Sequence, residues 1–237
     1  MKITGGKYWD RPWSCVDGCT PCSPGCDHCW SMAMGKRFHK WPEKVTCRWD
    51  RLEIPRKVKK NYVWSIWNDL FHEAVTPDFV CEAFRVIHSC PDDTFLILTK
   101  RPQNINPKHF ELFQYPNVYL GLTICNQPEA DEKLPIFSQI PGKKFLSLEP
   151  MLSTIDLRPT HLPSGVTDPY WLLRCIDAVI LGGETGPGAR PMHPDWVRKV
   201  RDDCQAAGVN FFLKQMDGKH NRLLDGREHN DLAWRKG

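Results

Sequence analysis

The apolar residues of the chain fall into short runs, and each run is followed by a polar segment and then by a stretch with helical periodicity. Runs rich in β-branched and aromatic residues predict strands over 62–67, 94–98, 118–123, 144–148, 178–181 and 210–213. The helical stretches predict helices near 77–89, 106–114, 128–138 and 194–207. A short first strand over 7–17, interrupted by Pro12, and an extended segment over 45–52 complete the pattern.

Strands that are almost continuously apolar and alternate with helices are typical of a parallel sheet covered by helices on its outer face. Counting the first strand, the chain has about seven such units, one fewer than a complete barrel. We therefore predict an α/β fold, a partial (β/α)6–7 TIM-like barrel, formed as a single domain over 1–237. The Pro-containing interval 152–174 lacks a clear period and predicts a surface insertion or lid, and the polar segment 219–237 predicts a tail.

The composition supports an ordinary globular protein. Hydrophobic residues make up 41% and charged residues 25% of the 237 positions, so neither disorder nor a fibrous class is expected. No apolar run approaches the roughly 20 residues that span a bilayer, and the polar start Met1–Gly6 does not resemble a signal peptide. We expect a cytoplasmic protein without a membrane partner. The net charge of +4 permits a nucleic-acid partner, and the basic segment 51–60 is either a phosphate-binding patch or a solvated surface.

Four cysteines lie within eleven residues at Cys19, Cys22, Cys26 and Cys29. Proline and glycine between them keep the segment 18–30 out of regular structure, so several sulfur atoms can approach one point. The spacings C-x3-C-x2-C and C-x6-C-x2-C both suit iron–sulfur ligation, in which three ligands leave one iron of a four-iron cluster open. A four-cysteine zinc site is the alternative, although zinc knuckles normally separate their two C-x2-C pairs by about a dozen residues. A helix over 27–39 should follow, and the seven remaining cysteines are most simply buried thiols.

The cysteine loop and the following helix resemble the radical S-adenosylmethionine (SAM) superfamily. More narrowly, six blocks in order resemble a phage- and prophage-associated radical-SAM-like family: 13–29, 69–73, 98–102, 147–150, 182–194 and 211–215. The superfamily resemblance implies that three cysteines hold a [4Fe-4S] cluster, that SAM chelates the fourth iron, and that an external flavodoxin- or ferredoxin-type donor supplies one electron. Cys26 and Cys29 are ligands in both patterns, whereas the superfamily pattern selects Cys22 and the narrower family selects Cys19; we favour Cys19.

Polar residues follow the predicted strands, where barrel enzymes place their reactive groups. A zwitterionic cofactor that carries a ribose requires carboxylates, amides and a lysine, so we predict cofactor contacts from Trp30, Asn68, Asp69, Lys100, Thr123, Asn126 and Glu149. Catalytic or substrate contacts are predicted from Glu184, Arg190, His193, Lys214 and Gln215. The alternative is that these are ordinary loop residues, with Asp69 and Thr99 capping helices.

Two further features bear on ligand binding. The glycine-rich loop 182–188 lets a ligand approach the backbone, but it matches neither the Walker nor the dinucleotide motif. Trp9, Trp13, Trp30 and Trp67 would stack on adenine or on a nucleobase, or pack in the core.

The resemblance implies a radical SAM enzyme. With the phage association that it carries, the net positive charge and the tryptophan content, we expect this enzyme to modify, isomerise or repair a nucleobase of the thymine type in phage or host DNA, in the host cytoplasm if phage-encoded. Two alternatives remain open: a zinc-stabilised nucleic-acid-binding module and a non-catalytic iron–sulfur protein.

Overall fold

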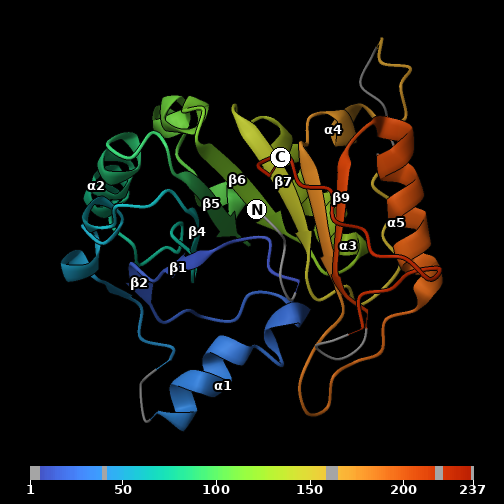
Figure 1. Cartoon of the computed structure of the whole chain (residues 1–237), viewed down its shortest axis with the longest axis horizontal. Helices are drawn as coiled ribbons and strands as arrows, with labels where there is room; N and C mark the ends of the chain where they lie inside the picture. Colours follow the sequence, from blue (N-terminus) through green and yellow to red (C-terminus); the bar gives the residue numbers. More distant parts are fainter. Residues whose placement is uncertain (1–5, 39–41, 159–164, 217–220, 236–237) are drawn as a thin grey trace. The chain divides into compact units, whose positions relative to one another are not determined.

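The alternation of strands and helices is present in the structure, a computed structural model that describes residues 6–38, 42–158, 165–216 and 221–235 (Figure 1). The chain forms two compact units. The first, here called the N-terminal unit, comprises Trp9–Leu122 and Ile140–Lys143. The second, the C-terminal unit, comprises Met1–Tyr8, Thr123–Gln139 and Lys144–Gly237.

The seven-stranded sheet has the order β1-β4-β5-β6-β7-β8-β9. In the N-terminal unit, β1 (Arg11–Trp13), β4 (Val63–Ile66), β5 (Thr94–Thr99) and β6 (Val118–Thr123) pair in parallel. In the C-terminal unit, β7 (Lys143–Leu148), β8 (Ala178–Gly182) and β9 (Asn210–Gln215) do the same. This is the strand order of a partial TIM-like barrel, so the predicted fold class is confirmed.

The strands β4 to β9 bury nearly every side chain, as the continuous apolar runs predict, whereas two of the three residues of β1 are exposed. All six residues of β6 and all five of β8 are buried. A strand buried on both faces has no polar positions to expose. For that reason the predicted boundaries of β4 to β9 agree with the observed ones to within two residues, whereas β1 covers only a small part of the first strand predicted over 7–17.

In the N-terminal unit, α2 (Pro77–His88) is the main covering helix. Thr76 caps it by accepting a hydrogen bond from the backbone N–H of Phe79, and Pro77 occupies its first turn. Its buried face includes Phe84, whose ring meets Phe113 edge-on at 5.3 Å between centroids. Phe113 lies on η5 (Pro107–Gln114), a 3-10 helix where an α-helix over 106–114 was expected.

Within the described residues of the cysteine segment and of the stretch from it to β4, the elements are short. These are β2 (Val16–Asp17), η1 (Pro24–Cys26), α1 (Trp30–Arg37), β3 (Thr46–Cys47), η2 (Trp49–Arg51) and η3 (Pro55–Lys57). The strands β2 and β3 pair antiparallel, separate from the main sheet. The expected helix over 27–39 is shorter at both ends, and its last position lies outside the described residues.

In the C-terminal unit, α5 (Pro194–Ala207) packs on β9, and the short α4 (Trp171–Arg174) packs against α3 (Gln127–Ser138) and α5. The helix α4 belongs to the expected insertion, of which 159–164 lie outside the described residues. Of the expected tail, 219–220 and 236–237 also lie outside them. The described part pairs Asn230 with Phe212 of β9 and donates a hydrogen bond from Trp234 Nε1 to Tyr8 O at 2.9 Å.

Among the described residues, none of the helices has the length and apolar character needed to cross a membrane.

Candidate functional site

The cysteine loop is a tight turn held by its own backbone. The backbone N–H of Gly25 donates to Ser23 Oγ at 3.1 Å, and the N–H of Cys26 donates to Ser23 O at 2.8 Å. The N–H of Cys29 then donates to Cys26 O at 3.1 Å. At the start of the loop, Gly18 has φ 77° and lies so close to Lys44 O that a Cβ would be 2.2 Å from it. Only glycine fits this position.

All eleven cysteines are free thiols, so the loop is not a disulfide knot. The turn brings Cys22 close enough to Cys26 for its thiol to donate a hydrogen bond to the Cys26 sulfur, which lowers the pKa of Cys26 to about 5 and raises that of Cys22. Burial raises the pKa of Cys19, against the opposing charge of Arg101. The lowered pKa favours the thiolate form of Cys26, which is the form that binds metals.

The donor set fits an iron–sulfur cluster in chemistry. The sulfurs of Cys19 and Cys22 both interact electrostatically with Cys26, and Cys29 is half-buried at the N-cap of α1. Within the described residues, however, no three His, Cys, Asp or Glu side chains are already arranged to hold a metal ion. The loop therefore supplies suitable ligands, and ligation requires its thiols to draw closer together.

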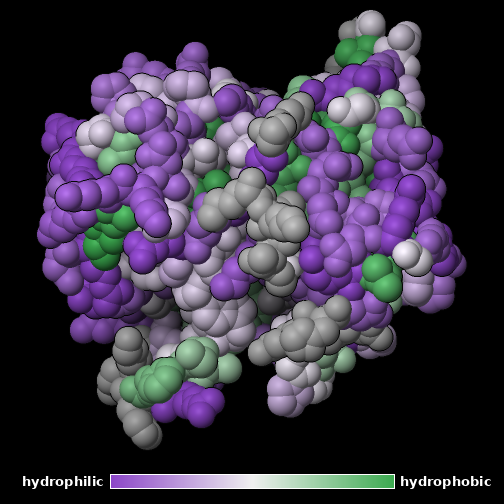
Figure 2. Space-filling model, in the orientation of Figure 1, coloured by the Kyte–Doolittle hydropathy of each residue, from purple (hydrophilic) through white to green (hydrophobic). Residues whose placement is uncertain are grey.

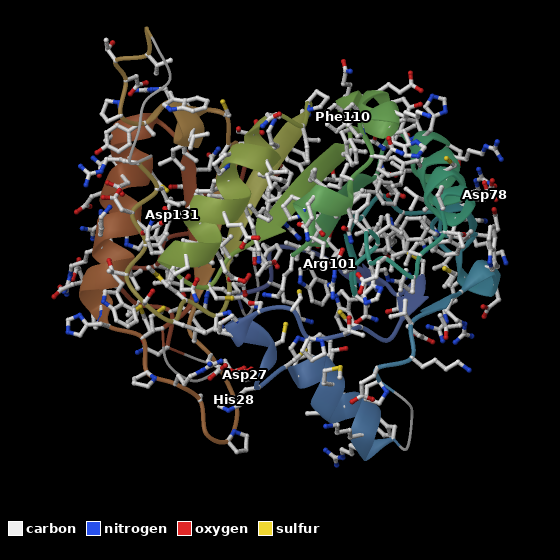
Figure 3. The ribbon with its side chains drawn as sticks, turned by 180° about the vertical axis from the view of Figure 1, so that it is seen from behind. Asp27, His28, Asp78, Arg101, Phe110 and Asp131 are labelled. Carbon is white, nitrogen blue, oxygen red and sulfur yellow. The ribbon has the colours of Figure 1, made fainter. Side chains whose placement is uncertain are left out.

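A buried arginine fastens the loop to the end of β5. Arg101 Nη2 donates to Thr20 O at 2.7 Å and to Thr20 Oγ1 at 3.0 Å, and Nη1 lies 3.9 Å from Cys19 Sγ. The hydroxyl of Thr20 also bonds His72 Nε2 at 2.8 Å. In Figure 3, Arg101 lies inside the unit, whereas Asp78 lies out on α2. The cysteine loop is thus held at the carboxyl ends of β4 and β5.

Asp69 connects those two strand ends. Its carboxylate accepts hydrogen bonds from Thr99 Oγ1 at 2.8 Å, from the backbone N–H of Phe71 at 3.0 Å and from that of Lys100 at 3.1 Å, and it pairs with Arg101 Nη1 at 3.2 Å. This carboxylate, for which we predicted a cofactor contact, is buried and accepts these hydrogen bonds from protein donors. Asp69 therefore ties the segment after β4 to the end of β5 and to Arg101.

Three other predicted residues lie around the cysteine loop. Asn68, in the left-handed region at φ 61°, donates from Nδ2 to Val16 O at 2.7 Å and accepts from Ser31 Oγ at 3.2 Å. Lys100 lies close enough to Cys26 for its charge to lower the pKa of that thiol, behind the larger effect of the Cys22 hydrogen bond. Trp30 is 54% exposed and meets Trp67 edge-on at 4.8 Å, and Trp67 meets Trp9 at 5.6 Å.

The C-terminal unit carries a second polar cluster at the ends of β7 and β9. Lys214 Nζ pairs with Glu149 Oε2 at 2.5 Å, and Ser147 Oγ lies 3.5 Å from the other carboxylate oxygen. Buried Tyr8 hydrogen-bonds with the same carboxylate, and burial, followed by the Glu149 charge, raises the pKa of its phenol. The side chains of Lys214 and Tyr8 thus meet at the carboxylate of Glu149.

Glu184 and Arg190 pair with each other. Glu184 is 7% exposed and accepts two hydrogen bonds from the Arg190 side chain, at 2.5 Å from Nη2 and 3.0 Å from Nε, and one from its backbone N–H at 2.9 Å. Gln215 Nε2 donates to Gly183 O at 2.7 Å, and a Cβ on Gly183 would clash with Met216 O. The glycine-rich loop thus lies tightly against the end of β9.

Three predicted site residues have simple roles in the fold. Asn126 caps α3 by accepting from the N–H of Glu129 at 3.0 Å, and exposed His193 caps α5 by accepting from the N–H of Asp195 at 3.2 Å. Thr123 is buried at the end of β6. The capping hydrogen bonds give Asn126 and His193 a role in the fold that needs no ligand.

Our sequence interpretation omitted several residues that shape these clusters: Tyr8, Thr20, His72, Glu73 and Arg101. All of these except Tyr8 fall within the blocks 13–29, 69–73 and 98–102, so the blocks were the signal that could have identified them. The predicted residues also divide between units. The cysteines, Trp30, Asn68, Asp69 and Lys100 belong to the N-terminal unit, and the others belong to the C-terminal unit.

Comparisons with known proteins place the chain in a family. Residues 4–234 match the family described as "Protein of unknown function (DUF5131)". No curated protein and no solved structure matches the chain. Because the family match spans almost the whole sequence, the chain belongs to the DUF5131 family.

Proposed function

We propose that this protein is a radical SAM enzyme whose cluster is held by three cysteines of the loop 18–30. The observation that carries the proposal is the loop itself: four free thiols, one with its pKa lowered to about 5, are fastened at the carboxyl ends of β4 and β5 by buried Arg101. In barrel folds this end of the strands carries the reactive groups. When bound there, a [4Fe-4S] cluster would supply an open iron for SAM and, with an electron from an external donor, reductive cleavage of SAM to a hydrogen-abstracting radical.

The residues of the chain would bind the cluster and surround it. Cys26 and Cys29, with Cys19 or Cys22, would be the ligands. Lys100 and Arg101 contribute positive charge beside the thiols, which favours an anionic thiolate-bound group. The nearby tryptophans Trp30, Trp67 and Trp9 form a chain of edge-on contacts that offers an aromatic surface to an adenine or a base.

For the substrate we propose a nucleobase of the thymine type in DNA. Three features support this: the net charge of +4, the exposed ring of Trp30, and the exposed basic side chains of Lys57, Lys59 and Lys60. Two neighbours in that segment are already paired, since Arg51 bonds Asp17 and Arg56 bonds Glu53. A filter-binding assay should show DNA affinity that falls as salt rises. Affinity that is absent, or indifferent to salt, would contradict the nucleic-acid part of the proposal.

The test of the enzyme itself is anaerobic reconstitution with iron and sulfide, followed by dithionite and SAM. We expect a brown protein that forms 5′-deoxyadenosine, and a Cys26→Ala variant that forms none. Cys175→Ala is the matched control, because Cys175 is exposed and lies outside the loop. A colourless protein with one zinc per chain would replace the proposal with a zinc-stabilised nucleic-acid-binding module. A brown protein that leaves SAM intact would replace it with a non-catalytic iron–sulfur protein.

A further inference from the structure

Arg101 uses all of its hydrogen-bonding capacity around the cysteine loop. An arginine side chain has five N–H donors. Here Nε meets Glu73 at 3.1 Å, Nη1 meets Asp69 at 3.2 Å and Cys19 Sγ at 3.9 Å, and Nη2 meets the two oxygens of Thr20 at 2.7 and 3.0 Å. The side chain is only 5% exposed. A guanidinium held at every nitrogen has one orientation, and that orientation directs it at the first cysteine of the loop.

The charge of Arg101 is only partly neutralised by its partners. Asp69 shares its negative charge among three other donors, namely the Thr99 hydroxyl and the N–H groups of Phe71 and Lys100. Glu73 is 62% exposed, so water screens its carboxylate. The positive charge of Arg101 therefore acts on the cysteine sulfurs, and Arg101 interacts electrostatically with Cys22 as well as with Cys19.

We propose that Arg101 is a positioning residue for the cluster, an inference that rests on the proposed function. It fixes the Cys19–Thr20 segment so that the loop presents its thiols together, and it places a permanent positive charge against Cys19 Sγ. Hydrogen bonds and charge at the sulfurs set the reduction potential of iron–sulfur clusters. Adding an electron makes the cluster more negative, so the guanidinium stabilises the reduced state that SAM cleavage requires.

Three substitutions separate positioning from charge. Arg101→Met removes both, so a chelator should strip iron about 10- to 100-fold faster than from the wild type, and the midpoint potential should shift to lower values. Arg101→Lys keeps the positive charge but loses the planar set of donors that holds the loop. The midpoint potential should therefore lie closer to that of the wild type than in Arg101→Met, while iron loss stays fast. Thr20→Val removes only the loop hydroxyl, so iron loss should accelerate with the potential unchanged. Arg85→Met, at a 73% exposed side chain on α2, is the control and should change neither.

The readouts are the rate of iron loss and the potential from an EPR-monitored redox titration, neither of which depends on turnover. If the cluster remaining in Arg101→Met keeps the wild-type potential, the inference is overturned while the proposed function stands. If both Arg101 variants fail to fold, Thr20→Val decides, and a wild-type rate of iron loss there contradicts the inference. If the wild-type protein itself takes up no cluster, the proposed function fails instead.

Discussion

Asp69 is the residue on which the N-terminal site most depends for stability. Its side chain is 7% exposed, and it pairs with a guanidinium that is 5% exposed. Removing one member of a buried ion pair leaves the other charge uncompensated, which costs about 3–5 kcal/mol. We expect Asp69→Ala to lower the free energy of unfolding by that amount in urea denaturation. Asp78→Ala, at the exposed first turn of α2, should cost about 1 kcal/mol or less. Equal effects of the two substitutions would refute this role for Asp69.

Cys19 and Cys22 have different surroundings, which predicts different consequences of losing each thiol. Cys19 is half-buried beside Arg101, whereas Cys22 is exposed and donates to Cys26. We expect Cys22→Ala to retain iron and visible absorbance after reconstitution, and Cys19→Ala to lose both. The opposite result would assign the third ligand to Cys22.

His229 makes stability depend on pH. Burial first, and then the charges of Arg227 and Arg201, lower its pKa below the usual value of about 6.5. Its Nε2 is buried and has no hydrogen-bond partner among the described residues. Since the unfolded chain then binds the proton more readily, the stabilisation is present above about pH 6.5 and is lost as the pH falls toward the folded pKa. Urea unfolding at about pH 7.5 and about pH 5.5 should show this loss, and His229→Phe should reduce it. An unchanged pH dependence in the variant would exclude His229 as the cause.

At the scale of elements, α1 and α2 differ in what holds them. No residue of α1 is buried, and Figure 2 shows hydrophobic side chains at the surface in this region. Met34 in the helix and Phe38 directly after it are 43% and 60% exposed. Phe84 on α2 is 1% exposed. Phe38→Ser should therefore change the unfolding free energy by less than about 0.5 kcal/mol, whereas Phe84→Ala should cost about 3–5 kcal/mol. A large loss from Phe38→Ser would show that the C-terminal end of α1 is packed in solution.

The same contrast explains how far the sequence could predict the elements. The helix over 194–207 was predicted at its observed bounds because capping by His193, Pro194 and the C-terminal Gly208 mark its ends. The helix after the cysteine loop was predicted too long because it lacks a buried face to define it. At 107–114 the apolar pattern could not distinguish a 3-10 helix from an α-helix, since both present similar faces over so few turns.

Site residues were harder to predict than strands because their partners come from distant parts of the chain. The position of Asp69 after a strand was evident from the apolar run, but its engagement by Thr99 and Arg101 depends on β4 pairing with β5. Likewise, Glu149 meets Lys214 only because β7, β8 and β9 are neighbours in the sheet. The sequence therefore indicated where the polar residues lie relative to the strands. Which of them already have hydrogen-bond or ion-pair partners within the protein depends on tertiary contacts.

For the whole molecule, the proposed function requires a cysteine loop that binds a cluster with one open iron. The most direct measurement is the EPR spectrum of the reconstituted, reduced protein, recorded with and without SAM. We predict a [4Fe-4S] signal that changes its g values when SAM is added, because SAM binds the iron that lacks a cysteine. The absence of a cluster signal, or a signal that SAM leaves unchanged, would contradict the account.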